Sequence, residues 1–319
     1  MQAVIPVAGV GKRLKPLTNT IPKVLLNVAG KPSIAFILDK MIAKGVTDVV
    51  FVTGYLGGVV EDYIKKNYPN LKATFVEQKE RLGTAHAVLQ AEPYIKDDVF
   101  IIFGDTIFDG DFSLATKGDG VIFVAETTDP QRFGIVELKG KYIKRIIEKP
   151  KNPPTNLANI GMYYIKDSKD MFKQIHRLID EDIRPLGEYQ IVDAFQFMIE
   201  GGAKIESKTI EKWLDTGKIE TTLDTNHYLI SKMDQPKVKG IIPPVFLGKG
   251  VVIENSEVGP NVTLNDGCVI VNSKIKHVIV DEKSRIENCE LENSLIGKEV
   301  TVKKFKGNVM LGDFDTLHS

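Results

Sequence analysis

The chain has 319 residues, of which 43% are hydrophobic, and its 42 basic residues balance 42 acidic ones. This length suits one large domain with a smaller partner, and the hydrophobic fraction excludes a chain that is disordered throughout. The neutral balance argues against nucleic acid as the main partner, because binding to a phosphate backbone needs a net basic face. A local basic cluster around one small anion stays compatible with it.

The chain contains two cysteines, Cys268 and Cys289. It lacks the basic segment followed by an apolar stretch that is typical of a signal peptide, and no apolar run reaches about 18 residues. We therefore expect a cytoplasmic protein that does not bind a membrane, with two buried thiols rather than a disulfide.

The first 235 residues alternate apolar strands with helices. We expect strands at 2–8, 47–54, 73–78 and 98–105, and helices at 33–45, 59–68 and 84–92. Strands that are apolar on both faces indicate a Rossmann-like, mostly parallel sheet that is covered by helices on both sides. In such folds ligands collect at the carboxyl ends of the strands.

The alternation loosens at 120–165, where short strands predict an antiparallel insertion. Helices near 167–180 and 188–201, a strand at 203–210 and a closing helix near 218–232 complete this part.

The pattern changes after residue 235 to short β-branched runs separated by Gly, Asn and Ser. Apolar residues recur about every sixth position, at Val252, Val258, Leu264 and Ile270, which is typical of a β-helix. We therefore predict two domains, at 1–235 and 236–319. A small antiparallel β domain is the alternative for the second.

The stretch GVGKRL begins at Gly9, directly after the first apolar strand. A dinucleotide-binding loop would have a third glycine where Leu14 stands, and a Walker A loop would have Ser or Thr in place of Arg13. Even so, Gly9 and Gly11 allow backbone N–H groups to approach an anion, and four basic residues follow nearby, Lys12, Arg13, Lys15 and Lys23. The stretch is therefore either a phosphate-binding loop or a solvated basic loop.

A longer pattern distinguishes between these two interpretations. The order Gly9, Gly11, Arg13, Pro16, Thr18, Pro22, Lys23 and Leu26 resembles the signature of the sugar-1-phosphate nucleotidyltransferases. Further segments resemble that family in the same order through residue 233, among them EQKERLGTAHAV, FGDTIFDGD, IIEKP, GEYQIVDA and WLDTG. The likeness is greatest to the longer glucose-1-phosphate thymidylyltransferase-like members, which implies that a short left-handed parallel β-helix follows the catalytic domain.

The resemblance implies transfer of a nucleoside monophosphate from dTTP or UTP to glucose-1-phosphate, with release of pyrophosphate. The attacking phosphate is already an anion, so the protein must supply positioning, charge neutralisation and a metal ion rather than a general base. Asp105 and Asp215 resemble the family's Mg²⁺ ligands, and hard carboxylate oxygens suit that ion. We interpret the nearby Asp109 and Asp111 as turn residues.

The resemblance also implies three catalytic cations. Arg13 would lie against the triphosphate and stabilise the departing pyrophosphate, Lys149 would hold the sugar phosphate, and Lys23 would make a second phosphate contact.

The expected substrate-binding residues form three groups. Gly9 and Gly11 would face the triphosphate. Gln78, Gly83 and Thr84 would read the base, because an amide that both donates and accepts suits uracil or thymine. Gly134, Glu148, Asn159 and Gly161 would contact the sugar. We interpret Glu188 and Asp193 as residues that begin a helix.

Other functions stay open at this point. Within the family they are N-acetylglucosamine-1-phosphate uridylyltransferase and mannose-1-phosphate guanylyltransferase. Outside catalysis, the chain could be a regulatory subunit that senses nucleotide sugars, although Arg13, Asp105, Lys149 and Asp215 are all present. Acetyl transfer is disfavoured, because the C-terminal part is short and its internal His277 has no obvious catalytic partner. We expect any homo-oligomer to assemble through that part.

Overall fold

The computed structural model describes residues 1–110 and 112–318, so the interpretation of Asp111 lies outside it. The chain forms two compact units. One unit, here called the sheet unit, contains residues 1–9 and 37–213, and the second unit contains residues 10–36 and 214–319. The division falls within α1 (Ser33–Ala43).

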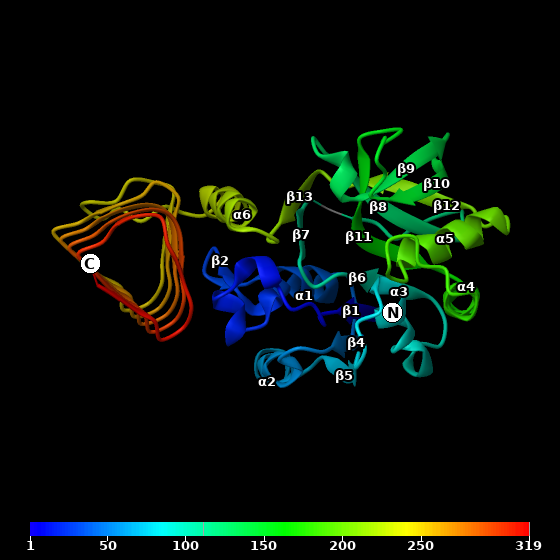
Figure 1. Cartoon of the computed structure of the whole chain (residues 1–319), viewed down its shortest axis with the longest axis horizontal. Coiled ribbons are helices and arrows are strands. Elements are labelled where there is room, and N and C mark those ends of the chain that lie inside the picture. Colours follow the sequence, from blue (N-terminus) through cyan, green and yellow to red (C-terminus); the bar gives the residue numbers. More distant parts are fainter. Residues whose placement is uncertain (111, 319) are drawn as a thin grey trace. The chain divides into compact units, whose positions relative to one another are not determined.

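A nine-stranded sheet forms the centre of the sheet unit, in the order β5-β4-β1-β6-β11-β8-β12-β10-β9 (Figure 1). Its strands are β1 (Gln2–Pro6), β4 (Asp48–Thr53), β5 (Lys72–Glu77), β6 (Val99–Ile102), β8 (Gly120–Glu126), β9 (Gly134–Lys139), β10 (Tyr142–Glu148), β11 (Leu157–Ile165) and β12 (Ile205–Thr209). β1 pairs in parallel with β4 and β6, as predicted. β11 runs antiparallel to β6 and β8, so the insertion joins the same sheet and makes it mixed rather than mostly parallel.

Helices of the sheet unit lie where the apolar spacing predicts them. They are α2 (Gly57–Asn67), α3 (Thr84–Leu89), α4 (Ser168–Asp180) and α5 (Ile191–Glu200). α5 packs on β10, α3 and α4 and buries Phe195 completely. The Asp167 side chain caps α4 by accepting a hydrogen bond from Asp170 N at 3.0 Å, which satisfies a backbone donor that the helix itself leaves free.

The second unit contains α6 (Ile219–Ser231) and a stack of short strands between residues 245 and 318, here called the stacked strands. They are β14 (Val245–Leu247), β15 (Val252–Glu254), β16 (Glu257–Val258), β17 (Val262–Leu264), β18 (Val269–Val271), β19 (Lys274–Val280), β20 (Arg285–Glu287), β21 (Glu290–Ile296), β22 (Thr301–Lys303), β23 (Lys306–Gly307), β24 (Met310–Leu311) and β25 (Thr316–His318). All their pairings are parallel among the described residues, which excludes the antiparallel alternative.

The predicted six-residue repeat describes most of the interior of the stacked strands. Val258, Leu264 and Ile270 are completely buried, but Val252 is 41% exposed. Val252 pairs with Val269, whereas Ile253 pairs with the buried Ile270. Because side chains alternate along a strand, Ile253 rather than Val252 packs on the core in this first coil.

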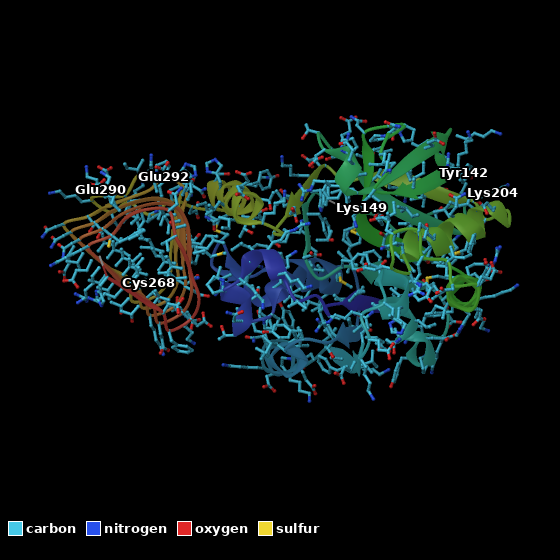
Figure 2. The ribbon with its side chains drawn as sticks, in the orientation of Figure 1. Tyr142, Lys149, Lys204, Cys268, Glu290 and Glu292 are labelled. Atoms are coloured by element: carbon cyan, nitrogen blue, oxygen red, sulfur yellow. The ribbon has the colours of Figure 1, made fainter. Side chains whose placement is uncertain are left out.

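Both cysteines are free, buried thiols in the core of the stacked strands, as predicted, and Figure 2 shows Cys268 within these strands. The Cys268 Sγ donates to the carbonyl oxygen of Asp281 at 3.1 Å, and burial raises the pKa of this thiol to about 12. Cys268 is therefore a protonated core residue.

Residues 10–36 belong to the same compact unit as α6 and the stacked strands. They form three short 3₁₀ turns, η1 (Lys12–Leu14), η2 (Leu17–Asn19) and η3 (Lys23–Leu25), followed by a hairpin of β2 (Asn27–Val28) and β3 (Lys31–Pro32). The predicted boundary at residue 235 therefore marks the change in sequence pattern, whereas the compact units divide the chain differently. In the described part of the chain, no helix has the length and apolarity needed to cross a membrane.

Replacing Asp167 with Ala should lower the free energy of unfolding by about 1 kcal/mol, because it removes the cap of α4. Urea denaturation followed by circular dichroism measures this change. Lys173→Ala, on the exposed face of the same helix, is the matched control and should be close to neutral. Equal stability of the two variants would show that the cap contributes nothing.

Candidate active site

Asp105 lies just beyond the carboxyl end of β6, as the sequence predicts. The two preceding backbone N–H groups are bonded, Phe103 N to Gly161 O at 3.0 Å and Gly104 N to Pro6 O at 3.2 Å. These bonds fix the turn that presents the half-buried Asp105 at the edge of the sheet. Thr106 follows at the start of β7 (Thr106–Asp109), and its buried hydroxyl donates to Ile160 O at 3.0 Å.

Asn159 organises the backbone around the expected sugar segment. It is buried, and its Nδ2 donates to Gly134 O at 3.1 Å. Its Oδ1 accepts from Gly161 N at 3.2 Å and from the Tyr163 hydroxyl at 2.5 Å. The structure thus brings Gly134, Asn159 and Gly161 together, and it gives the Asn159 amide an internal role. Tyr163, which the sequence analysis did not single out, completes this network.

Gly134 is required by close packing. A Cβ atom at this position would overlap Asn159 Nδ2 and lie 2.8 Å from Glu148 Oε2. Glu148 therefore lies directly against the glycine backbone, where the sequence analysis expects the sugar to bind.

Glu148 and Lys149 form an ion pair at the end of β10, with Lys149 Nζ 3.2 Å from Glu148 Oε1. Lys149 has a φ of 43°, and its backbone N donates to Phe133 O at 3.0 Å. This left-handed backbone turns the lysine out of the strand, and its side chain is 50% exposed. Lys149 is thus available to an anion while Glu148 holds its position.

Asp193 is a residue whose surroundings the sequence analysis did not predict. It lies in the first turn of α5, as expected, but burial and the charge of Glu148 raise its pKa to about 6. Its Oδ2 is buried without a hydrogen-bond partner among the described residues. Glu148 and Asp193 are distant in sequence, and only the fold brings the two acids together. Glu188, by contrast, is exposed and lies two residues before Gln190, the N-cap of α5, so its interpretation as a residue that begins the helix is wrong.

The expected base-reading loop centres on Gln78, which is only 5% exposed. Gln78 Nε2 donates to Gly83 O at 3.1 Å and lies 3.2 Å from His86 Nδ1. A carbonyl oxygen can only accept, so Nε2 is the donor of this amide and His86 Nδ1 must accept from it. The orientation of the Gln78 amide is thereby fixed, with its Nε2 end engaged by the protein. His86 is a second residue that the sequence analysis did not assign to this loop.

Gly83 and Thr84 connect this loop to the start of α5. Gly83 has a φ of 120°, and a Cβ there would overlap the backbone of Tyr189. Thr84 Oγ1 donates to Gln190 Oε1 at 3.1 Å and accepts from Ile191 N at 2.9 Å. The Thr84 hydroxyl thus has a structural role in the protein.

In the second unit, Gly11 packs directly against Lys23. Gly11 has a φ of 67°, and a Cβ there would lie 2.9 Å from Thr18 Cγ2 and 3.1 Å from Lys23 Cβ. Thr18 Oγ1 donates to Gly11 O at 3.0 Å, which closes the loop. Arg13 is exposed in η1. The structure therefore brings two elements of the expected phosphate loop together.

Asp215 ends β13 (Lys212–Asp215) and precedes α6. Its Oδ1 accepts from Gly217 N at 2.9 Å, and its backbone oxygen accepts from Thr225 Oγ1 at 2.9 Å. The half-buried carboxylate is thus held at a fixed turn.

The predicted site residues are divided between the two units. The sheet unit contains Gly9, Gln78, Gly83, Thr84, Asp105, Gly134, Glu148, Lys149, Asn159 and Gly161. The second unit contains Gly11, Arg13, Lys23 and Asp215.

Comparisons with known proteins identify the family of this chain. A family model described as nucleotidyl transferase matches residues 2–232. A glucose-1-phosphate thymidylyltransferase of Streptomyces antibioticus is 32% identical over 95% of this chain and 93% of its own length. The bifunctional protein GlmU of Methanocaldococcus jannaschii is 35% identical over 79% of this chain, and the match spans 60% of that protein.

Among solved structures, a UDP-glucose pyrophosphorylase complexed with UDP-glucose has a TM-score of 0.62 and 23% identity. The match covers 73% of this chain and 99% of that one, and it confirms the α/β nucleotidyltransferase fold. The family resemblance predicted from the signature is confirmed by the family model over most of the chain. The chain therefore belongs to the nucleotidyl transferase family of enzymes.

Proposed function

We propose that this enzyme transfers a nucleoside monophosphate from dTTP or UTP to glucose-1-phosphate and releases pyrophosphate. The observation that carries the proposal is the orientation of the buried Gln78 amide. Its Nε2 end is bound to Gly83 O and His86 Nδ1, so Oε1 is the atom that would accept a hydrogen bond from a base. Uracil and thymine present an N–H donor on the edge that such an amide reads, whereas cytosine presents an acceptor at the same position. Similarity to the Streptomyces thymidylyltransferase over nearly the whole chain supports the same choice.

The expected roles follow from the chemistry of each side chain. Lys149, which is held by Glu148, would neutralise the sugar phosphate. Arg13 and Lys23, with the backbone of Gly9 and Gly11, would bind the triphosphate and stabilise the charge that develops on pyrophosphate. The sugar would lie against the glycine backbone that Asn159 organises.

We propose that Asp105 and Asp215 each supply a carboxylate to Mg²⁺, because each is a half-buried hard oxygen donor at a turn that is fixed within its own unit. When bound there, Mg²⁺ would neutralise phosphate charge and polarise the reacting phosphate. The protein's own part is to orient the two phosphates so that the attacking oxygen meets the α-phosphorus in line.

We further propose that the stacked strands are a left-handed β-helix. Their parallel register and the three-sided coils visible in Figure 1 support this. His277 Nδ1 lies 3.1 Å from Asn261 Nδ2 in a structural network, which supports packing rather than acetyl transfer as its role. Assembly of a homo-oligomer through this region and a cytoplasmic location stay predictions.

The direct test of the proposal is pyrophosphate release with Mg²⁺ and glucose-1-phosphate, with dTTP, UTP, CTP, GTP and ATP in parallel. We expect release with dTTP or UTP and at least about tenfold less with CTP. N-acetylglucosamine-1-phosphate is a second acceptor to test, because N-acetylglucosamine-1-phosphate uridylyltransferase is an alternative that the sequence analysis leaves open. Mannose-1-phosphate with GTP tests the remaining family alternative. Silence with every pair would favour a regulatory subunit.

Replacing Asp105 with Asn should lower kcat by about 10² or more with little change in melting temperature, because it removes a proposed metal ligand from an ordered turn. Asp109→Asn is the matched control, since Asp109 ends the next strand and pairs with Lys40 at 3.4 Å. Near-normal turnover of Asp105→Asn across a Mg²⁺ titration would contradict the assignment.

Replacing His86 with Ala should relax the choice of base. Without the acceptor at Nδ1 the Gln78 amide keeps only its bond to Gly83 O and is held less firmly, so the preference for the favoured pyrimidine over CTP should fall about tenfold. The ratio of kcat/KM values for the two nucleotides measures this. His176→Ala, at an exposed histidine that pairs with Glu92, should leave the ratio unchanged. An unchanged ratio in His86→Ala would mean that Gln78 needs no support from His86.

A further inference from the structure

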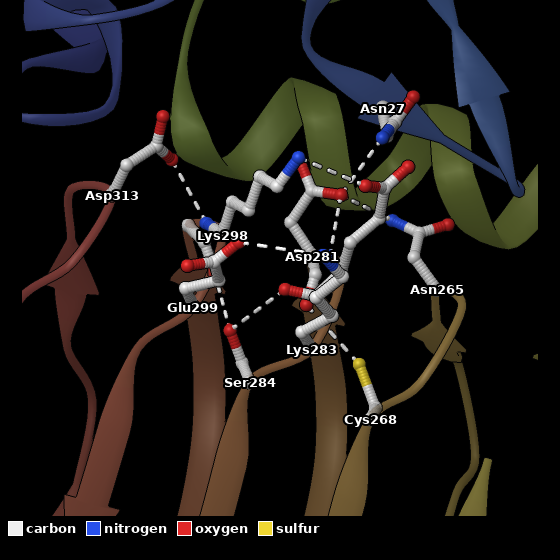
Figure 3. A network of polar contacts seen from close by, with 11 residues as sticks. Asn27, Asn265, Cys268, Asp281, Lys283, Ser284, Lys298, Glu299 and Asp313 are labelled. Carbon is white, nitrogen blue, oxygen red and sulfur yellow. Dashed lines mark hydrogen bonds and ion pairs between the residues drawn. The ribbon is translucent and has the colours of Figure 1, made fainter. Parts of the chain in front are cut away.

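The hairpin at residues 27–32 is joined to the stacked strands by a partly buried polar contact. Asn27 Nδ2 donates to Asp281 Oδ1 at 2.8 Å (Figure 3). The same carboxylate oxygen accepts from Asn265 Nδ2 at 3.1 Å and from Glu282 N at 2.8 Å. Burial raises the pKa of Asp281, and the hydrogen bond from Asn27 counteracts that rise. The contact thus compensates an acid that the fold has partly removed from water.

A second contact fastens the turn of the same hairpin. Ala29 N donates to Asn226 Oδ1 at 2.9 Å, and Asn226, on α6, is completely buried. Thr263 Oγ1 donates to the same oxygen at 2.6 Å, and Asn226 Nδ2 donates to Asn261 Oδ1 at 3.0 Å. Every polar atom of the Asn226 amide is therefore engaged, so its position is set by the stacked strands on one side and the hairpin on the other.

Close packing adds to these polar contacts. Gly30 has a φ of 86°, and a Cβ there would overlap the ring of Phe246. Nearer the start of the segment, Thr20 Oγ1 donates to Asp313 Oδ2 at 2.8 Å. Residues 10–36 thus meet the stacked strands at points spread along both.

The hairpin and the turn that carries Lys23 form one piece. Ser33 Oγ donates to Val24 O at 2.9 Å, and Ser33 N donates to Leu26 O at 3.1 Å. Lys23 in turn packs against Gly11. A constraint on the hairpin is therefore transmitted through short bonds to both elements of the expected phosphate loop.

We propose that Asp281 and Asn226 are positioning residues, which hold the hairpin at 27–32 and through it set Lys23 and Gly11 for the triphosphate. This inference rests on the proposed function. It gives the stacked strands a part in nucleotide binding that is separate from any role in assembly.

The test compares Asn27→Ala, Asp281→Ala, Asp281→Asn and the double alanine variant by steady-state kinetics with the nucleotide that wild type prefers. Each single alanine variant should raise KM for the nucleotide about tenfold and leave KM for the sugar phosphate within about twofold. The double variant should be no worse than Asp281→Ala alone, because Asp281→Ala already removes the contact with Asn27. Asp281→Asn keeps an acceptor oxygen and should recover part of the loss. Glu292→Gln is the control, because Glu292 belongs to the same strands and forms an ion pair with Lys276 at 2.9 Å.

Hydrogen exchange of the same full-length variants separates this inference from the proposed function. Asp281→Ala should speed exchange at residues 10–36 about tenfold, whether or not the enzyme is active. Unchanged exchange would overturn the anchoring contact. Faster exchange with an unchanged KM for the nucleotide, or equal increases in both KM values, would overturn the positioning role. An inactive wild type with faster exchange in the variant would instead count against the proposed function alone.

Discussion

Buried side-chain amides need internal hydrogen-bond partners. This constraint fixes the backbone of the sugar segment, the base-reading loop and the hairpin at 27–32. Asn159 uses its amide to hold the glycine backbone of the sugar segment, and Gln78 is locked by Gly83 and His86. Asn226 does the same for the hairpin. The amides of Asn159 and Asn226 join segments that are distant in sequence, whereas that of Gln78 closes a local loop. The backbone groups that would meet a substrate are therefore fixed before any substrate arrives, which is the arrangement that electrostatic catalysis requires.

A second constraint is that phosphate chemistry needs cations on a rigid support. Lys149 directly follows β10 and itself has a left-handed backbone. Lys23 lies in a turn that packs against Gly11. Lysine is a flexible point charge, so its surroundings must limit the positions that it can take. The two lysines belong to different compact units, and each unit has its own means of holding its lysine.

Much of the fold could be predicted because it is encoded locally. The apolar runs before Asp105 predict its place at a strand end, and the spacing along 33–45 predicts a helix. The six-residue repeat places Val258, Leu264 and Ile270 in the core but fails at Val252, where the first coil is shifted by one residue. The six-residue repeat in the sequence cannot reveal this shift, because Ile253, the residue next to Val252, is also apolar.

The remaining features depend on contacts between distant residues. Asn27 and Asp281 are 254 positions apart, and neither belongs to a motif. From the sequence, Asp193 is interpreted as an ordinary residue at a helix start, but in the structure the charge of Glu148 acts on it. Tyr163 likewise has the pattern of an ordinary strand residue, but its hydroxyl donates to Asn159. A single sequence carries no signal for such pairs. The division of the predicted site residues between two units could not be predicted for the same reason. Residues 10–36 belong to the second unit, although the residues on both sides of them in the sequence belong to the sheet unit.

The measurement that tests the central claim most directly follows an isotope through the reaction. Glucose-1-phosphate labelled with ¹⁸O in its phosphate would be incubated with Mg²⁺ and dTTP or UTP, and the products would be identified by mass spectrometry. Attack of the sugar phosphate on the α-phosphorus predicts that all of the label is found in the nucleotide sugar and none in the released pyrophosphate. Label in free phosphate or in pyrophosphate, or no nucleotide sugar at all, would contradict the proposed reaction.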